Sequence, residues 1–295
     1  MTRFTIFLIL SSFLFSQTAF ARSYKTSRSA LVVDSSGKVL YSENADEPRH
    51  PASLTKKMTL YLLFEALKQN KIKLNTRFKV SPTAARQMPC KLGISSGKEV
   101  TVEVIIKALV TKSANDMALT AAEGLAGSLP KFVAIMNKKA QELSMHCTHF
   151  TNASGVPDRN KHMLRISNTN RRQSTTARDM VTLSMALHRD FPEYWKYFQL
   201  RSFTFQGNVH HNHNHLMKSF PGMDGIKTGW VTASGFNLST SAVRYTQSGK
   251  AVRLFAVYLG GSTRHDRDRR IANLMEIQFK RLGATIVRQK KVSES

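Results

Sequence analysis

Stretches rich in β-branched and other apolar residues lie near both ends of the chain, and a long stretch of helical pattern separates them. Residues 30–33 and 39–42 flank a polar, glycine-containing turn, which is typical of a β-hairpin. Residues 236–243 and 252–259 form a second such pair near the C-terminus. Because strands must bury their apolar faces against other elements, one antiparallel sheet built from both ends is the most economical fold.

The middle of the chain carries apolar residues at helical spacing and predicts a helical lobe. Recognisable signals bound the expected helices, such as Thr101 at one start, Gly127 at one end and Pro130 at another start. The expected helices cover residues 54–69, 101–109, 117–125, 130–145, 176–187 and 266–282. The expected fold class is therefore α/β of the α+β type, an antiparallel sheet flanked by helices with an all-helical lobe.

The N-terminus has the three-part layout of a cleavable secretory signal. Arg3 precedes an apolar run at residues 4–15, and a small-residue cleavage site follows that run. A membrane-spanning helix needs about 20 apolar residues, so the run is too short to span a bilayer. We expect a signal peptide over 1–21, one catalytic domain over 22–285 and a basic flexible tail over 286–295. An uncleaved N-terminal anchor is the alternative.

The chain is strongly basic, with a formal net charge of +25. Removal of residues 1–21, whose only charged residue is Arg3, leaves 43 basic and 19 acidic residues, a net charge of +24. Such a surface attracts polyanions, and nucleic acid is the usual candidate. Export argues against nucleic acid and favours anionic peptides or lipid head groups. A solvated basic surface without a partner is the alternative.

Two cysteines and a group of histidines are further candidates for special chemistry. Cys90 and Cys147 would meet an oxidising compartment after export and could pair, but their separation cannot be read from the sequence. His211, His213 and His215 alternate with asparagines, and no cysteine or carboxylate joins them. A polar strand or loop is therefore favoured over a metal site, and no metal or cofactor is expected.

Three short motifs occur in order along the chain: Ser53-Leu54-Thr55-Lys56, Ser113-Ala114-Asn115 and Lys227-Thr228-Gly229. Each pattern alone is weak, because residues 35–38 repeat the first and residues 42–44 repeat the second. Those two copies fall in the expected N-terminal hairpin, which offers no helix end to activate a nucleophile. The three motifs outside the hairpin are therefore the candidates.

Ser53 is the candidate nucleophile. It stands at the N-cap position of an apolar helix, where free N–H groups and the helix dipole can stabilise a developing oxyanion. Lys56 lies three residues later on the same helical face, within reach of the hydroxyl. A lysine acts as a base only when neutral, and burial together with a nearby cation such as Lys227 lowers its pKa. Lys57 and Lys112 are expected to be solvated or to support these groups.

In this order and context, the motifs resemble those of serine penicillin-binding proteins, in particular the low-molecular-mass D-alanyl-D-alanine carboxypeptidases of peptidase family S11. The resemblance covers nearly all of the chain after residue 21. Its matching segments are 44–53, 109–116, 152–155, 176–180, 224–229 and 234–238. It implies a fold like that of β-lactamases and transpeptidases. It also implies a periplasmic hydrolase, inhibited by penicillin, that removes the terminal D-Ala from peptidoglycan pentapeptides.

The resemblance also implies a role for each catalytic candidate. Ser53 would attack the carbonyl of the penultimate D-Ala, and Lys56 would accept its proton. Ser113 would help to pass that proton to the departing D-Ala nitrogen. Asn115 would hold the peptide amide, and water would then cleave the acyl-enzyme.

The third motif is implied to bind the substrate. Lys227 and Thr228 would bind the terminal carboxylate, and Gly229 would let the strand approach closely. The backbone N–H groups of Ser53 and Trp230 would form the oxyanion hole. The expected partners are thus peptidoglycan stem peptides and β-lactams, with electrostatic contact to an anionic membrane surface as an additional expectation.

This chain departs from the family pattern in two places near the substrate. Trp230 stands where some relatives have a smaller or polar residue, so the pocket shape does not follow from the resemblance. Many relatives place an arginine near the substrate carboxylate after a Gly-Gly pair, where this chain has Ser262. Arg264, two residues later, is the candidate replacement.

Three other activities remain as alternatives. A class A β-lactamase would need a loop glutamate for deacylation, and the chain has no Glu-x-x-Leu-Asn, while Ala114 stands where that class has aspartate. An endopeptidase cutting D-alanyl-meso-diaminopimelate cross-links would use the same groups as a carboxypeptidase. A wall-binding protein without activity would use none of them.

Overall fold

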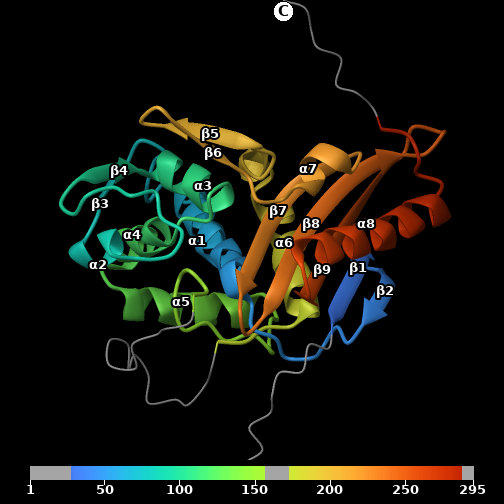
Figure 1. Cartoon of the computed structure of the whole chain (residues 1–295), viewed down its shortest axis with the longest axis horizontal. Helices are drawn as coiled ribbons and strands as arrows, with labels where there is room; N and C mark the ends of the chain where they lie inside the picture. The colour runs from blue at the N-terminus through green and yellow to red at the C-terminus, as the bar shows by residue number, and fades with distance from the viewer. Residues whose placement is uncertain (1–27, 157–172, 288–295) are drawn as a thin grey trace, which may run out of the picture.

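The computed structural model describes residues 28–156 and 173–287. Its centre is a five-stranded antiparallel sheet with strand order β2-β1-β9-β8-β7 (Figure 1). The strands are β1 Ser29–Asp34, β2 Val39–Glu43, β7 Met223–Val231, β8 Gly235–Tyr245 and β9 Ala251–Gly261. Because β1 pairs with β9, the two ends of the chain build one sheet, and the expected fold class is confirmed. The third motif lies on β7, an edge strand.

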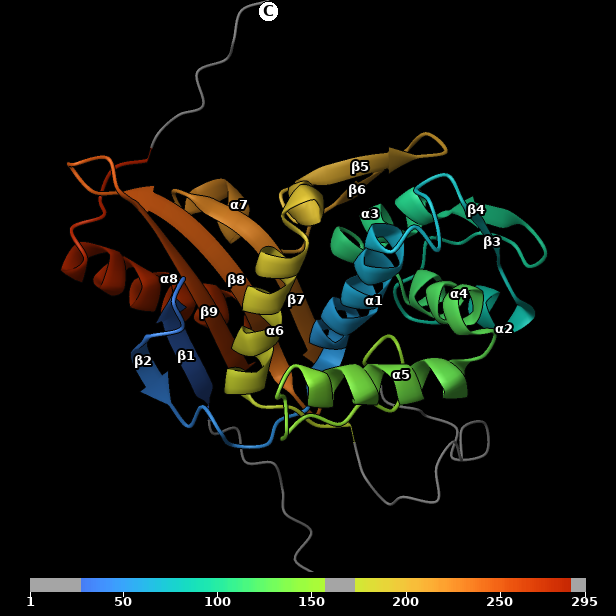
Figure 2. The same ribbon diagram turned by 180° about the vertical axis from the view of Figure 1, so that it is seen from behind.

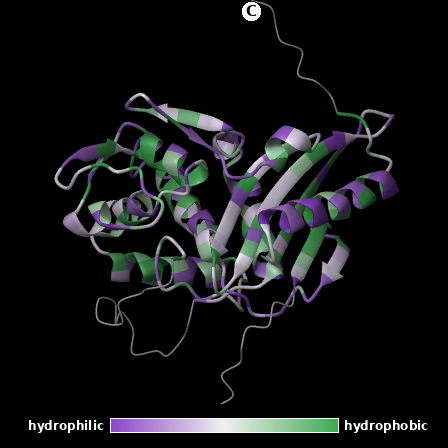
Figure 3. Ribbon diagram, in the orientation of Figure 1, coloured by the Kyte–Doolittle hydropathy of each residue, from purple (hydrophilic) through white to green (hydrophobic). Residues whose placement is uncertain are grey.

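Alternating side chains bury both faces of the central strands. Val33 and Phe255 belong to the core that the sheet shares with the helical lobe, whereas Val32 and Ala256 belong to a second core. Helix α6 (Ala177–Asp190) packs on the first face and α8 (Arg264–Arg281) on the second, as the two opposite views show (Figures 1 and 2). Most of α8 is coloured hydrophilic in Figure 3 because one stripe alone faces the sheet.

The helical lobe follows its predicted boundaries closely. Thr101 caps α3 by accepting a hydrogen bond from Val104 N, and Gly127 ends α4 with a positive φ of 75°. Helix α5 ends three residues before the predicted position 145. The lobe consists of α1 Lys56–Lys68, α2 Pro82–Ala85, α3 Val102–Val110, α4 Asn115–Ala126 and α5 Leu129–Glu142, with the added hairpin of β3 Arg77–Lys79 and β4 Glu99–Thr101.

Short elements without a clear sequence pattern complete the fold. They are the 3-10 helices η1 Ala52–Thr55 and η2 Pro192–Tyr197, the hairpin strands β5 Ser202–Phe205 and β6 Asn208–His211, and helix α7 Leu216–Ser219. Strand β6 ends at His211, so the histidines at 213 and 215 lie outside it. At the other end of the described chain, Ile286 exchanges two backbone hydrogen bonds with Tyr245. The predicted signal peptide over 1–21 lies outside the described residues, as does most of the predicted tail.

Lys57 is fully buried rather than solvated, and it ties α1 to the sheet. Its Nζ donates to Met180 O at 2.7 Å, to Ser184 Oγ at 2.7 Å and to Ser239 Oγ at 2.8 Å. No carboxylate is among these acceptors. Burial therefore lowers the pKa of Lys57 well below its usual value. The side chain thus links α1, α6 and β8 through hydrogen bonds to uncharged acceptors.

We predict that Lys57→Met is tolerated at neutral pH, because Ser184 Oγ still donates to Met180 O and still contacts Ser239 Oγ in its absence. The lowered pKa of Lys57 means that the unfolded state binds the additional proton, so wild-type stability rises with pH up to about 10.5. The rise has a slope of at most about 1.4 kcal/mol per pH unit. Urea unfolding of both proteins from pH 7 to 10 measures this. The free-energy difference should move in favour of the wild type as pH rises, and a constant difference contradicts the prediction.

Candidate active site

The first two motifs meet at the amine of Lys56. Its Nζ lies 2.9 Å from Ser53 Oγ, 2.7 Å from Asn115 Oδ1 and 2.7 Å from the backbone oxygen of Ser154. Asn115 Oδ1 and Ser154 O can only accept, whereas the Ser53 hydroxyl can also donate. A neutral amine has two N–H groups and one lone pair, so it can donate to the two fixed acceptors and accept from Ser53. This geometry fits a lysine that takes a proton from the serine.

Electrostatics favour the neutral form of Lys56. The side chain is 0% exposed. Burial is the main reason that its pKa lies well below the usual value, and the positive charge of Lys227 lowers the pKa further. Cys90 and Asp116 act in the opposite direction without reversing the shift. The charges around Lys56 thus include the second cation that the sequence predicts.

Lys227 is also buried, with 1% exposure, and its environment differs from that of Lys56. Burial lowers the pKa of Lys227 to about 7, with a smaller contribution from Arg267 in the same direction. Its Nζ donates to Thr228 O at 2.9 Å and has no other acceptor within the described segments. Lys227 therefore keeps N–H donors for a ligand anion.

Ser113 lies in the break between α3 and α4 that the sequence predicts. Its φ is +59°, an uncommon conformation for a residue with a side chain, and its buried Oγ has no hydrogen-bond partner among residues 28–156 and 173–287. Neighbouring Asn115 is held firmly, because its backbone N–H donates to Cys90 O at 2.6 Å and its Nδ2 donates to Met88 O at 3.1 Å. The buried hydroxyl of Ser113 thus lies near a fixed amide without a partner of its own in the described residues.

The sequence predicts Ser53 as the N-cap of α1, and this prediction is wrong. Ser53 lies within the single 3-10 turn η1 that precedes α1. Ala52 before it has a φ of +49°, so the chain turns sharply into the nucleophile. Gly155, with a φ of +83°, packs against this turn. A Cβ at Gly155 would lie 1.8 Å from Ala52 O, so this position requires glycine. The apolar sequence signal for the helix could not distinguish its first turn from a 3-10 turn.

Strand β7 approaches the nucleophile as closely as its glycine allows. A Cβ at Gly229 would lie 3.0 Å from Ser53 N and 3.1 Å from Pro51 O. Thr228 is buried beside it, whereas Trp230 is 55% exposed, with its ring 5.8 Å from that of Phe236. The third motif therefore lies against the first, and the Trp230 side chain forms the open edge of the site.

The positive charge of Arg267 acts on Lys227, although no sequence pattern marks this arginine as a site residue. Arg267 is buried and binds Asp268, with Nε at 2.8 Å and Nη2 at 2.6 Å from one carboxylate oxygen. Arg264 is exposed, and no hydrogen bond or ion pair of its guanidinium is found in the described residues. A contact of Arg264 with a substrate carboxylate thus stays a prediction.

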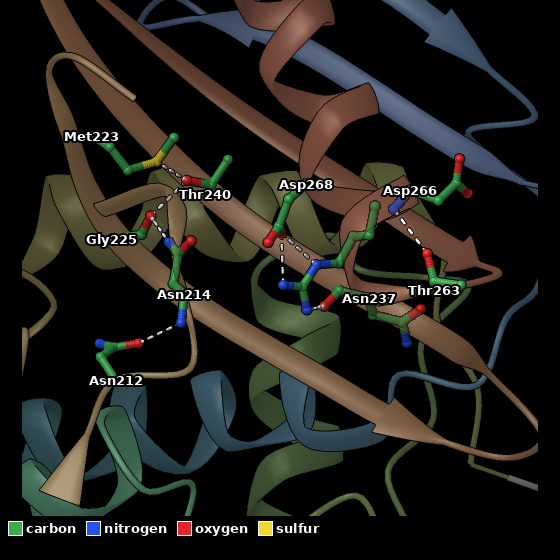
Figure 4. A network of polar contacts seen from close by, with 10 residues as sticks. Asn212, Asn214, Met223, Gly225, Asn237, Thr240, Thr263, Asp266 and Asp268 are labelled. Atoms are coloured by element: carbon green, nitrogen blue, oxygen red, sulfur yellow. Dashed lines mark hydrogen bonds and ion pairs between the residues drawn. The ribbon is translucent and has the colours of Figure 1, made fainter. Parts of the chain in front are cut away.

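Asn237 joins the segment before Ser53 to two strands and a helix. Its Nδ2 donates to His50 O at 3.1 Å and Pro51 O at 3.3 Å, and its Oδ1 accepts from Gly260 N at 3.0 Å. Its backbone oxygen accepts from Arg267 Nη1 at 3.4 Å, within the polar network of Figure 4. In the sheet, Asn237 is also the partner of Gly229. One buried amide therefore sets the position of β7 relative to the nucleophile.

The described residues contain neither a cluster of metal-ligating side chains nor a disulfide bond. No group of three or more His, Cys, Asp or Glu side chains could hold a metal ion there. Cys90 and Cys147 are both free thiols. No helix in the described part of the chain is long and apolar enough to cross a membrane.

The sequence profile of the D-alanyl-D-alanine carboxypeptidases, peptidase family S11, matches residues 16–263. The chain belongs to this family. Among its relatives is the D-alanyl-D-alanine carboxypeptidase DacC of Escherichia coli, which is 36% identical over 265 residues, 85% of this chain and 62% of the relative. The chain spans between 60% and 66% of the length of the first curated relatives it matches.

Solved structures of D-alanyl-D-alanine carboxypeptidases and penicillin-binding proteins share the fold. Penicillin binding protein 5 from Haemophilus influenzae superposes with a TM-score of 0.77 at 31% identity, covering 86% of this chain and 71% of that protein. Penicillin-Binding Protein D2 from Listeria monocytogenes in its ampicillin-bound form gives a TM-score of 0.73 at 28% identity, covering 87% of this chain and 98% of that one. The predicted family and fold are confirmed.

We predict that Asn237→Ala slows penicillin acylation of this family S11 protein at least about tenfold and lowers the free energy of unfolding by about 1–3 kcal/mol. Loss of the amide frees the segment before Ser53 from β8, which separates the nucleophile from β7. Acylation should be timed by intact-mass measurement far below the unfolding temperature. Asn208→Ala, on the exposed hairpin β5–β6, is the matched control and should react at the wild-type rate. Wild-type acylation by Asn237→Ala would exclude this positioning role.

Proposed function

We propose that the protein is a serine D-alanyl-D-alanine carboxypeptidase that removes the terminal D-Ala from peptidoglycan pentapeptides and is inhibited by penicillin. The observation that carries this proposal is the 2.9 Å contact between Lys56 Nζ and Ser53 Oγ, made by a buried amine of lowered pKa. Family membership supports the same reaction. The related E. coli protein is named a D-alanyl-D-alanine carboxypeptidase.

In the proposed acylation, Ser53 Oγ attacks the carbonyl carbon of the penultimate D-Ala and its proton moves to Lys56 Nζ. The backbone N–H groups of Ser53 and Trp230 stabilise the oxyanion. As the C–N bond breaks, the proton passes to the nitrogen of the departing D-Ala through the Ser113 hydroxyl. The unpaired, buried Oγ of Ser113 suits this transfer, because no group in the described part of the chain competes for it.

Substrate binding and deacylation use the remaining motif residues. Lys227 and Thr228 bind the terminal carboxylate, and Asn115 holds the peptide amide on the acyl side. After D-Ala leaves, Lys56 is neutral again and takes a proton from a water molecule that attacks the ester carbonyl of Ser53. The bond between that carbon and Ser53 Oγ then breaks, and Lys56 returns the proton to Ser53 Oγ. Gly229 lets strand β7, which carries Lys227 and Thr228, lie close to the nucleophile throughout the reaction. The reaction needs no cofactor.

We also propose that the protein is exported through a signal peptide over 1–21 and works in the periplasm. The high positive charge then concentrates anionic stem peptides near the site, because charged surfaces raise local counter-ion concentration. Contact with an anionic membrane surface would be electrostatic. Nucleic acid is not a proposed partner.

We predict one covalent benzylpenicillin adduct per wild-type molecule, visible by intact-mass spectrometry, and none on Ser53→Ala. With purified pentapeptide muropeptides, the wild type should release single D-Ala. Ser53→Ala should release at least about a thousandfold less, because no other group replaces the nucleophile. Unfolding curves of both proteins control for structure.

Other products would replace this proposal with one of its rivals. Loss of cross-linked dimers without release of D-Ala would indicate an endopeptidase. Many turnovers of nitrocefin per second would indicate a β-lactamase. Unchanged muropeptides together with an unlabelled serine would indicate a wall-binding protein without activity.

The two lysines predict a bell-shaped pH dependence of the acylation rate constant. Lys56 must be neutral to act as base, so the rate rises with pH as this residue loses its proton. Lys227 must be charged to bind the carboxylate, so the rate falls above its pKa of about 7. Because the lysines interact, the two limbs report apparent pKa values of the pair. Stopped-flow acylation by benzylpenicillin from pH 5 to 10 measures both limbs.

The variant Lys227→Arg tests the assignment of the alkaline limb. A guanidinium stays charged across this range, so the fall above pH 7 should disappear while the acid limb remains. An unchanged alkaline limb in Lys227→Arg would assign that limb to another group.

A further inference from the structure

The peptide group between Pro51 and Ala52 is held at both of its polar ends. Its oxygen, Pro51 O, accepts from Asn237 Nδ2 at 3.3 Å and from Leu54 N at 3.2 Å. Its N–H, on Ala52, donates to His50 Nδ1 at 3.1 Å, and no other acceptor for this N–H is found in the described part of the chain. Because the N–H and C=O of a trans peptide group point in opposite directions, these contacts hold one plane from two sides.

This peptide plane is held in the less favourable of two orientations. Ala52 has a φ of +49°, a region that residues with a side chain rarely adopt, and Pro51 has a ψ of −22°. Rotation of the plane by about 180° would bring Ala52 φ to about −130° and Pro51 ψ to about 160°, near the values of β and polyproline II structure. Such a flip leaves the flanking chain nearly in place. The hydrogen bonds at the two polar ends therefore oppose it.

His50 supplies the acceptor for the N–H end as a neutral imidazole. A neutral ring has one N–H and one nitrogen with a free lone pair, so acceptance at Nδ1 requires the tautomer protonated at Nε2. Burial lowers the pKa of His50 to about 4, so the ring is neutral at neutral pH. The backbone around the ring is fixed as well. His50 O accepts from Asn237 Nδ2 at 3.1 Å, and Arg49 exchanges two backbone hydrogen bonds with Thr175.

The orientation of this plane decides where the nucleophile lies, because Ser53 directly follows Ala52. Ser53 Oγ lies 2.9 Å from Lys56 Nζ. On its other side, Ser53 N is so close to β7 that a Cβ at Gly229 would lie 3.0 Å from it. A displacement of about 1 Å at a reacting group can lower a rate about a hundredfold. A flip next to Ser53 would therefore impair the attack.

We propose that His50 is a positioning residue for Ser53, which accepts the Ala52 N–H and so prevents the peptide group before Ala52 from flipping. The inference rests on the proposed function, since it gives His50 a part in the attack by Ser53. His50 acts through the backbone and contacts no substrate atom. Asparagine can replace it, because an asparagine side chain accepts from the N–H two residues later in the chain.

Stopped-flow acylation by benzylpenicillin at neutral pH, over a range of concentrations, tests this role. It separates the limiting acylation rate constant from the half-saturation concentration. His50→Phe keeps a ring and removes the acceptor. Its limiting rate constant should fall at least about tenfold, because the nucleophile is displaced. Its half-saturation concentration should stay within about twofold of the wild type, because Lys227 and Thr228 still bind the carboxylate.

Two further variants distinguish loss of the acceptor from other effects. His50→Asn should keep the limiting rate constant within about threefold of the wild type, because the acceptor is retained. His146→Phe, the same change in the exposed turn after α5, is the matched control and should react like the wild type. Urea unfolding curves show whether each variant is folded.

The tautomer of His50 tests the inference on the wild type, and it decides should His50→Phe prove unfolded. In NMR of the ¹⁵N-labelled protein, the signals of His50 are assigned by their absence in His50→Asn. They should show a proton on Nε2 and none on Nδ1. A proton on Nδ1 would overturn the inference, because that nitrogen could no longer accept.

The kinetic outcomes separate failure of this inference from failure of the proposed function. A wild-type limiting rate constant in folded His50→Phe would overturn the positioning role, even if the half-saturation concentration rises. Equal losses in His50→Phe and His50→Asn would also overturn it, because the loss would then come from something other than the acceptor. Absence of a penicillin adduct on the wild type would overturn the proposed function itself.

Discussion

The proposed chemistry depends on an uncharged amine at Lys56 in contact with the hydroxyl of Ser53. Two of its three oxygen neighbours, Asn115 Oδ1 and Ser154 O, cannot donate, so only a neutral amine satisfies them and also accepts from the serine. Burial removes the water that would stabilise an ammonium, and Lys227 adds repulsion. The base is thus prepared by its surroundings before substrate arrives.

This arrangement requires close packing between segments that are far apart in the chain. The partners of Lys56 are 59 and 98 residues away from it. Two close backbone approaches bring the required segments together. Gly155 lies too close to Ala52 for any Cβ, and Gly229 lies so close to Ser53 that a Cβ would be a tight fit. The five-stranded sheet holds Gly229 in place against Ser53, because β7 pairs with β8 and β8 pairs with β9. The fold therefore serves to hold three short motifs against one another.

The sequence predicts the sheet, the main helices and the three motifs because each has a local signal, either periodicity or spacing. It does not predict contacts made across the chain. Ser154 and Asn237 fall in the family-like segments 152–155 and 234–238, but no local pattern predicts that they bind through a backbone oxygen and a buried amide. The buried ion pair of Arg267 has no sequence signal at all. The 3-10 turn at Ser53 and the burial of Lys57 were missed for a related reason, since both depend on tertiary packing.

Adjacent Lys56 and Lys57 show that a lowered pKa does not by itself make a catalytic base. Burial lowers the pKa of both amines, and each contacts three oxygens. The neighbours of Lys57 are packed between α1, α6 and β8, where no substrate atom can reach. The neighbours of Lys56 include a partly exposed hydroxyl at the open edge of β7. What distinguishes the two lysines is therefore access to a reacting group, which the edge position of β7 provides.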